Sequence, residues 1–163
     1  MKIPRASDVV SSVFGIGYFP AAQGTIMSAI ALPLAILLAI KAGGYVGVGG
    51  TAILVLVIGI LSCSEHVRET GNPDPSECVI DELAGQLLAS AFVAFGALSL
   101  PAFFLTFVLF RIFDIWKPWP VRWADRRVKG GLGIMLDDLF AALYAMLSLL
   151  VLLALGGVSG VRS

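Results

Sequence analysis

Residues 45–63 read YVGVGGTAILVLVIGILSC, a continuous apolar run without a charged side chain. A helix needs about 20 apolar residues to cross a hydrocarbon core about 30 Å thick. The runs at 83–100 and 136–155 also come close to that length, whereas those at 25–40 and 101–116, of about 16 residues, are marginal alone. Together they predict an all-α fold, a compact polytopic transmembrane helical bundle with four to five spans.

The composition agrees with a membrane protein. Of the 163 residues, 58% are hydrophobic and only 13% are charged, against about 25% charged in an average soluble domain. This balance excludes a disordered chain, a nucleic-acid binder and an ordinary cytosolic enzyme. The length allows one domain, residues 1–163, and residues 9–22 are predicted to form an interfacial or re-entrant helix.

The lysines and arginines predict the orientation, because cytosolic loops of membrane proteins are enriched in them. With the N-terminus inside, the cytosolic side receives eight of them: Lys2, Arg5, Arg68, Lys117, Arg122, Arg126, Arg127 and Lys129. The outer side receives only Lys41 and Arg162, and Arg111 lies within a predicted span. The loops at 64–82 and 117–135 are therefore expected in the cytosol.

Acidic residues precede the third apolar run, in the stretch Asp74-Pro-Ser-Glu-Cys-Val-Ile-Asp-Glu82. With Ser76 as the helix N-cap, Glu77 and Asp81 lie four residues apart on one helix face. Stacked carboxylates repel unless a cation lies between them, and oxygen ligands suit Mg²⁺. The alternative is a solvated first turn favoured by the helix dipole, which explains Glu77 better than Asp81 and Glu82.

A second charged group follows the fourth run. Arg111, Asp114 and Lys117 are three residues apart and line one stripe of a helix that ends near Pro118. One interpretation is an ion pair at a span end, beside interfacial tryptophans. The other makes Asp114 a metal ligand, with Arg111 and Lys117 holding an anionic group.

A third group opens the fifth run, where the glycine-rich stretch Gly130-Gly-Leu-Gly133 is expected to form a turn before Asp137 and Asp138. Thr25 or Ser28 is expected to help cap the first span. His66 is expected to be solvated, and Cys63 and Cys78 are interpreted as packing residues. With one histidine and without Cys-x5-Arg, Asp-x-Asp or Gly-x-Ser-x-Gly, the remaining chemistry is metal-assisted and acts on a phosphate-bearing lipid.

The stretch Phe110-Arg-Ile-Phe-Asp-Ile-Trp-Lys-Pro-Trp-Pro-Val-Arg-Trp-Ala-Asp125, with Gly130 to Asp138, resembles the phosphatidylglycerophosphatase A family. Val79-Ile-Asp-Glu-Leu-Ala-Gly85 and Gly24-Thr25 follow in matching order, so the resemblance covers about residues 12–150. It implies a multi-pass, Mg²⁺-dependent enzyme of the bacterial inner membrane. Its substrate would be phosphatidylglycerophosphate and its product phosphatidylglycerol.

The residues and the resemblance together give a mechanistic hypothesis. The Mg²⁺ ligands are expected to be carboxylates, namely Glu77, Asp81, Glu82, Asp114, Asp137 and Asp138. Asp81, Asp114 and Asp137 are the expected catalytic residues, with Asp81 or Asp137 as general base. The substrate-binding residues are expected to be Arg111, Lys117, Arg122 and Thr25.

Three alternatives stay open at this point. A covalent aspartyl-phosphate could replace direct attack by water. A small transporter or channel subunit would also use intramembrane Arg/Asp residues, although the charges gather at one membrane face. A non-catalytic lipid-binding protein would keep the basic loop without needing carboxylates in three segments. Nothing in the sequence assigns an oligomeric state.

Overall fold

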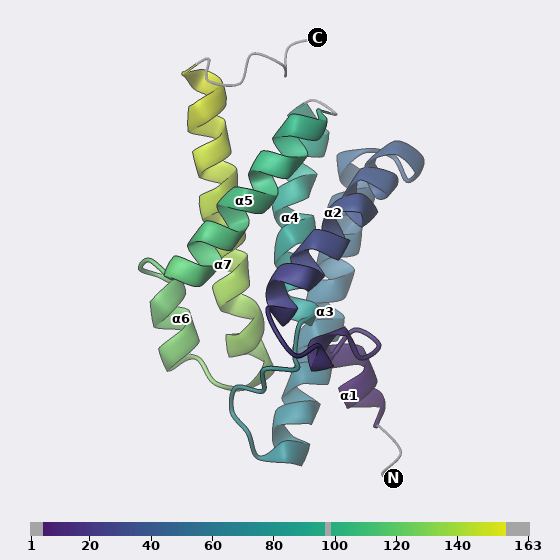
Figure 1. Ribbon diagram of the computed structural model, residues 1–163, viewed down its shortest axis with the longest axis vertical. Helices are drawn as coiled ribbons and strands as arrows, with labels where there is room; N and C mark the ends of the chain where they lie inside the picture. Colours follow the sequence, from purple (N-terminus) through teal and green to yellow (C-terminus); the bar gives the residue numbers. More distant parts are fainter. Residues whose placement is uncertain (1–4, 97–98, 156–163) are drawn as a thin grey trace.

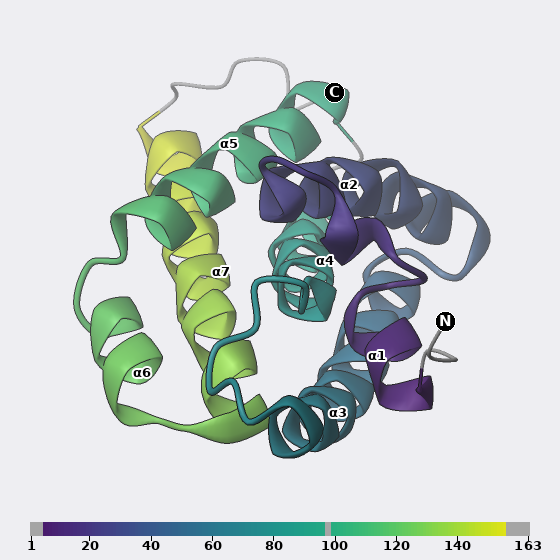
Figure 2. The ribbon, with the colours of Figure 1, turned by 60° about the horizontal axis from the view of Figure 1, so that its bottom comes forward.

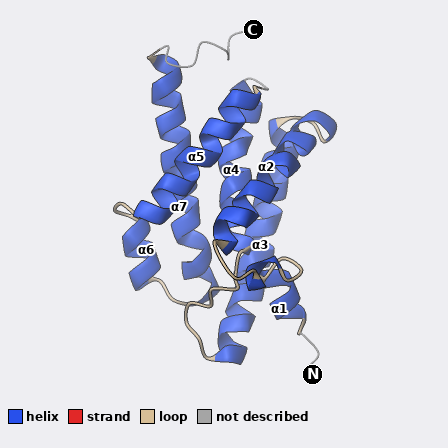
Figure 3. Ribbon diagram, viewed as in Figure 1, coloured by secondary structure: helices blue, strands red, loops and turns tan. Residues whose placement is uncertain are grey.

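The computed structural model describes residues 5–96 and 99–155 as helices and connecting loops, without a β-strand in those ranges (Figures 1 and 3). The elements in chain order are α1 (Ala6–Ser11), the 3₁₀ helix η1 (Ile16–Tyr18), α2 (Gln23–Lys41), α3 (Tyr45–Thr70), α4 (Ile80–Gly96), α5 (Leu100–Trp116), α6 (Val121–Arg127) and α7 (Gly130–Ala154). The all-α fold expected from the sequence is confirmed.

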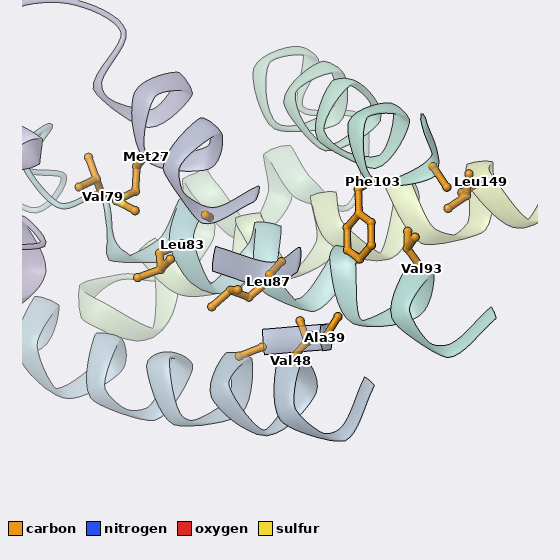
Figure 4. Packing of buried hydrophobic residues seen from close by; sticks show 13 residues of the cluster. Met27, Ala39, Val48, Val79, Leu83, Leu87, Val93, Phe103 and Leu149 are labelled. Carbon is orange, nitrogen blue, oxygen red and sulfur yellow. The ribbon is translucent and has the colours of Figure 1, made fainter. Parts of the chain in front are cut away.

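Helix α4 lies at the centre of the bundle and packs against α2, α3, α5 and α7 (Figure 2). Nine of its 17 residues are buried. Leu87 of α4 packs in one cluster with Val48 of α3, Phe103 of α5 and Leu149 of α7 (Figure 4). Because α4 is enclosed by its neighbours, polar groups at its N-terminus are held in a fixed setting.

Three helices, α2, α3 and α7, are long and apolar enough to cross a membrane. The α4 and α5 helices have 17 residues each, or about 25 Å at 1.5 Å per residue. Four or five spans are expected from the sequence. The three helices that are long and apolar enough to span are fewer than this. The number is compatible with the expectation, because α4 and α5 lie within the same bundle.

Local sequence explains where two helices end. Gly71, with φ +71°, ends α3 in the left-handed conformation that glycine adopts without strain. Lys117 takes the same conformation at the end of α5, with φ +48°, and Pro118 follows it. A lysine held there is strained, and its side chain belongs to the site described below.

The N-terminal segment 9–22 contains the end of α1 and η1, and α1 packs against α3. The backbone N–H of Val79 donates a 3.0 Å hydrogen bond to the carbonyl of Ser11. The hydroxyl of Tyr18 donates to the carboxylate of Asp8. This segment is therefore tied to α3 and to the loop before α4.

Two expected helix starts are wrong. Helix α4 begins at Ile80 and not after Ser76, because residues 75–78 form a turn in which the N–H of Cys78 donates to the carbonyl of Pro75. Helix α7 begins at Gly130, so the expected glycine-rich turn forms its first helical turn. At Gly131 a Cβ atom would collide with Ile60 and Ser64 of α3, so this glycine lets the two helices approach closely.

Candidate active site

A pocket of about 250 Å³ lies where the start of α4, the end of α5, α6 and the start of α7 meet. These ends, with the loop before α4, gather at the lower end of the molecule in Figure 1 and face the viewer in Figure 2. We call it the carboxylate pocket, because seven acidic side chains line it: Asp74, Asp81, Glu82, Asp114, Asp125, Asp137 and Asp138. Four helices and a loop thus bring distant parts of the sequence together.

Three of these side chains form a compact cluster. One carboxylate oxygen from each of Asp81, Glu82 and Asp138 lies within 4.8 Å of the others. Asp81 Oδ1, Glu82 Oε2 and Asp138 Oδ2 are enclosed, yet no described residue hydrogen-bonds them. Enclosed anionic oxygens without partners are costly, and oxygen ligands of this kind suit a hard divalent cation.

Lys117 crosses from the end of α5 into the carboxylate pocket. Its ammonium group donates to Asp125 Oδ1 at 2.5 Å and to Asp137 Oδ2 at 2.8 Å. Burial opposes its charge, but the two carboxylates outweigh burial and hold the pKa of Lys117 above its ordinary value. The lysine therefore stays protonated at neutral pH.

Arg111 pairs with another acid of the carboxylate pocket, Asp114. Its Nη1 is 2.6 Å from Asp114 Oδ2 and also donates to Ser28 Oγ of α2 at 3.4 Å. Its Nε is enclosed and has no hydrogen-bond partner among the described residues. A Cβ atom at Gly24 would collide with the Glu82 carboxylate and lie 3.2 Å from Arg111 Nη1. The glycine therefore lets the start of α2 close over this ion pair.

The charge of the pocket limits what can enter it. Seven carboxylates face only two cationic side chains, Lys117 and Lys129, in its lining. A phosphate would meet strong repulsion in such a setting unless bound cations offset the negative charge. The donor set and the unpartnered oxygens therefore fit one or more divalent cations.

The structure separates the sequence-predicted residues into groups. Asp81, Glu82, Asp114, Lys117, Asp137 and Asp138 line the carboxylate pocket, and Arg111 reaches it through Asp114. Arg122 and Thr25 line two neighbouring grooves. Glu77 lies outside the carboxylate cluster, because it precedes the first turn of α4 and does not share a helix face with Asp81.

Glu77 instead contacts His66 of α3. Glu77 Oε1 is 2.9 Å from His66 Nε2, and Asp8 Oδ1 is 3.9 Å from His66 Nδ1. Burial raises the pKa of Glu77, but the hydrogen bond with His66, a backbone hydrogen bond and the charge of His66 together outweigh burial and lower this pKa from its ordinary value of 4.5. The expectation of a solvated His66 is wrong, since the side chain is only 3% exposed.

Asp125 is, with Asp74 and Lys129, a charged pocket residue that is absent from the site residues expected from the sequence. It contacts Lys117 and closes the stretch Phe110–Asp125, so its place in that motif was the available signal. Cys63 and Cys78 are buried and free, and both belong to one apolar cluster. Burial agrees with their interpretation as packing residues.

Two grooves adjoin the carboxylate pocket. The first, about 500 Å³, shares Lys117 with it. We call it the basic groove, after the lining residues Trp116, Lys117, Pro118, Trp119, Arg122, Trp123, Arg126 and Arg127. The second, about 600 Å³, is lined by Thr25 of α2 and by the α5 residues Phe107, Val108, Arg111, Ile112, Ile115 and Trp116. We call this the apolar groove, and it meets the basic groove at Trp116.

The sequence of this chain is similar to those of known phosphatases. The family model described as Phosphatidylglycerophosphatase A matches residues 9–153. The protein named phosphatidylglycerophosphatase A from Escherichia coli (strain K12) is 35% identical over 86% of this chain and 80% of its own. The protein of the same name from Haemophilus influenzae is 35% identical over 82% of this chain and 80% of its own.

A third relative carries a different name. A protein of Bacteroides thetaiotaomicron, called a putative phosphatidylinositol-3-phosphatase, is 32% identical over 93% of this chain and 96% of its own. No solved structure matches the chain. The family-model match over residues 9–153 includes the helices that form the carboxylate pocket.

Proposed function

Because the chain belongs to the phosphatidylglycerophosphatase A family and is a phosphatase, we propose that it hydrolyses the terminal phosphomonoester of phosphatidylglycerophosphate. The products are phosphatidylglycerol and inorganic phosphate. The observation that carries this proposal is the carboxylate pocket, in which enclosed, unpartnered acids lie beside Lys117 and the Arg111–Asp114 pair.

The proposed cofactor is Mg²⁺, held by Asp81, Glu82 and Asp138, with Asp114 and Asp137 nearby on the pocket wall. Such an ion would offset charge on the phosphoryl oxygens and lower the pKa of a bound water. The fit rests on the three enclosed oxygens that no described residue satisfies. Glu77 is left out of the proposed ligand set, because its carboxylate contacts His66 of α3.

The basic residues and the remaining acids of the pocket have different roles in the proposal. Arg111 and Lys117 orient the phosphomonoester and stabilise the negative charge that spreads over its oxygens in the transition state. Asp137 is the proposed general base, because its contact with Lys117 positions the carboxylate at the pocket wall. Asp125 holds Lys117 from the other side, so it is a positioning residue.

The proposed setting is the bacterial inner membrane, crossed several times, with the carboxylate pocket on the cytosolic side. Support comes from α2, α3 and α7, which are long enough to span, and from the basic residues of α6 at the pocket end. Cytosolic ends of membrane proteins are enriched in such residues.

The test measures phosphate release from phosphatidylglycerophosphate by detergent-purified protein, with Mg²⁺ and with EDTA. Release that stops in EDTA and in Asp81→Asn supports the whole proposal. Release that persists in EDTA keeps the substrate and overturns the metal. If no phosphate is released with any divalent cation, phosphatidylinositol 3-phosphate is the next substrate, since one relative is named for it.

Oxygen labelling and chemical trapping together separate direct hydrolysis from a covalent aspartyl-phosphate. In a single turnover in ¹⁸O-labelled water, direct attack places one labelled oxygen in the released phosphate. A covalent route also labels the phosphate when water attacks the phosphorus atom. When water attacks the acyl carbon instead, the released phosphate stays unlabelled, and digestion of the protein after one turnover finds the label in one aspartate. Trapping a phosphorylated aspartate with hydroxylamine decides the case, and its presence would overturn direct attack.

A further inference from the structure

The basic groove carries cations that the chemistry of the carboxylate pocket does not use. Three arginines line it, namely Arg122, Arg126 and Arg127. Among the described residues, none of these three lies within 4.0 Å of a carboxylate oxygen, whereas arginines elsewhere in the molecule have acidic partners. Arg122 and Arg126 are four residues apart in α6, so they share one helix face. A groove with unpaired guanidinium groups favours an anion.

The groove is also aromatic. All three tryptophans of the chain, Trp116, Trp119 and Trp123, line it, and Trp119 is 77% exposed. Tryptophan rings settle at the level of lipid headgroups, where one edge is apolar and the other is wet. The anion expected here is therefore part of a phospholipid.

The order of the three sites fixes which part of the lipid it is. The apolar groove meets the basic groove at Trp116, and the basic groove meets the carboxylate pocket at Lys117. A phospholipid with a phosphorylated alcohol headgroup has acyl chains, then a phosphodiester, then a phosphomonoester. The two series match step by step when the phosphomonoester lies in the carboxylate pocket.

We infer that the basic groove binds the internal phosphodiester of the substrate, through Arg122 and Arg126, while the phosphomonoester lies in the carboxylate pocket. This inference rests on the proposed function. It assigns specificity to α6: a lipid with both phosphates is bound at two points, and a lipid with a phosphomonoester alone is bound at one.

Binding is tested without catalysis. Phosphatidylglycerol carries the phosphodiester and no phosphomonoester, and the intrinsic fluorescence of the protein comes from the three tryptophans of the basic groove. In detergent micelles, phosphatidylglycerol is expected to change this fluorescence in a saturable manner and phosphatidylcholine is not. The Arg122→Gln/Arg126→Gln variant is expected to raise the half-saturating mole fraction at least about fivefold.

Arg5→Gln/Arg68→Gln is the matched control. It removes the same charge from exposed arginines elsewhere on the molecule, each paired with a glutamate. Wild-type binding in this control is expected. Equal loss in the control and the α6 variant would overturn the inference, because general attraction between charges would then explain the binding.

Kinetics supply the second test, with two competitors. In the α6 variant, inhibition by phosphatidylglycerol is expected to weaken at least about fivefold, while inhibition by inorganic phosphate stays as in wild type. KM for phosphatidylglycerophosphate is expected to rise and kcat to stay within about twofold. Equal weakening by both competitors would place the arginines on the phosphomonoester, and unchanged KM and inhibition would remove them from binding; either result overturns the inference.

The outcomes also separate the inference from the proposed function. If the wild-type protein hydrolyses phosphatidylglycerophosphate and the α6 variant binds and reacts as wild type does, only the inference is overturned. A wild-type protein that hydrolyses no lipid phosphate defeats the proposed function, and the fluorescence titration still reports on the groove. Because Arg122 and Arg126 are exposed, the variant is expected to elute from size exclusion as wild type does.

Discussion

Asp138 is among the most enclosed acids of the carboxylate pocket, at 2% exposure, and its Oδ2 has no partner among the described residues. The backbone N–H of Asp138 donates to Asp137 Oδ1 at 3.1 Å, so the two neighbouring carboxylates are held in different directions. The Asp138 carboxylate lies with those of Asp81 and Glu82, and the Asp137 carboxylate contacts Lys117. Adjacent residues in a helix diverge by about 100°, which makes this division of contacts possible.

Asp138→Asn is expected to abolish hydrolysis and to stabilise the metal-free protein. The substitution removes one charge from three acids that repel each other. Thermal unfolding in EDTA is expected at a higher temperature than wild type, and added Mg²⁺ is expected to shift the variant less. Differential scanning fluorimetry with a phosphate-release assay measures both.

The control is Glu65→Gln, which removes an acid that pairs with Arg68 away from the pocket. It is expected to leave activity and the Mg²⁺ shift unchanged. An Asp138→Asn protein with wild-type turnover would remove this residue from the proposed ligand set.

Glu77→Gln tests the contact with His66. The pKa of Glu77 is lower in the folded protein than its ordinary 4.5, so its ionised form stabilises the fold above that pH, and this stabilisation is lost as pH falls through the folded pKa. The variant is expected to be less stable by about 1–3 kcal/mol at pH 7. The difference is expected to shrink as the pH falls below 4.5 and through the lower pKa of the folded protein.

Urea unfolding at pH 7 and at acidic pH measures the difference. Ser76→Ala, at the neighbouring exposed position, is the control and is expected to unfold like wild type at both pH values. A difference that stays constant with pH would show that Glu77 stabilises by packing and not by its charge.

At the scale of elements, Gly131 of α7 is one of the glycines that let α3 and α7 approach closely. Gly131→Ala is expected to destabilise by about 1–3 kcal/mol, because its Cβ atom would collide with backbone and side-chain atoms of α3. Thermal or denaturant unfolding measures the loss. Activity is expected to fall as well, since Asp137 and Asp138 lie two turns further along α7.

Gly50→Ala in α3 is the matched control, because nothing lies within 4 Å of a Cβ atom there. It is expected to be neutral or slightly stabilising, since alanine favours a helix over glycine. If both variants lose the same stability, the α3–α7 contact is not the cause.

The same elements show how far the sequence predicts this fold. The five apolar runs predict α2, α3, α4, α5 and α7, because burial or lipid contact demands apolar side chains along most of each helix. The starts of α4 and α7 could not be predicted. A proline-rich turn with its own hydrogen bond delays α4 until Ile80. At the start of α7, Gly131 lies so close to α3 that a Cβ atom would collide with it, a tertiary contact that local sequence does not indicate.

The site divides in a similar way. Asp81, Glu82, Asp114, Lys117, Asp137 and Asp138 are predictable because charged residues beside apolar runs are costly and usually serve a function. The burial of His66 is not, since its partners Asp8 and Glu77 are distant in sequence and meet only through the packing of α1 on α3.

At the scale of the molecule, the orientation of the protein in the membrane can be measured by thiol labelling, because the native cysteines are expected to react poorly. Cys63 and Cys78 are both buried, so a membrane-impermeant maleimide is expected to label intact cells or inverted vesicles poorly. Arg127→Cys, at the pocket end, is expected to react only in inverted vesicles. Lys41→Cys, at the opposite end of α2, is expected to react in intact spheroplasts, and the reverse pattern would overturn the proposed cytosolic side.

The length of α4 has a consequence for how the enzyme meets its substrate. This central helix, at about 25 Å, is shorter than a hydrocarbon core of about 30 Å. In the proposed setting, with the carboxylate pocket on the cytosolic side, its acidic start is expected at or just below the plane of the lipid headgroups. The proposed substrate is then expected to arrive by lateral diffusion in the leaflet, without being extracted from it. The quantity that governs the rate becomes surface density, the number of substrate molecules per unit area of membrane, and diluting the leaflet with inert lipid slows the reaction even when the bulk amount is unchanged.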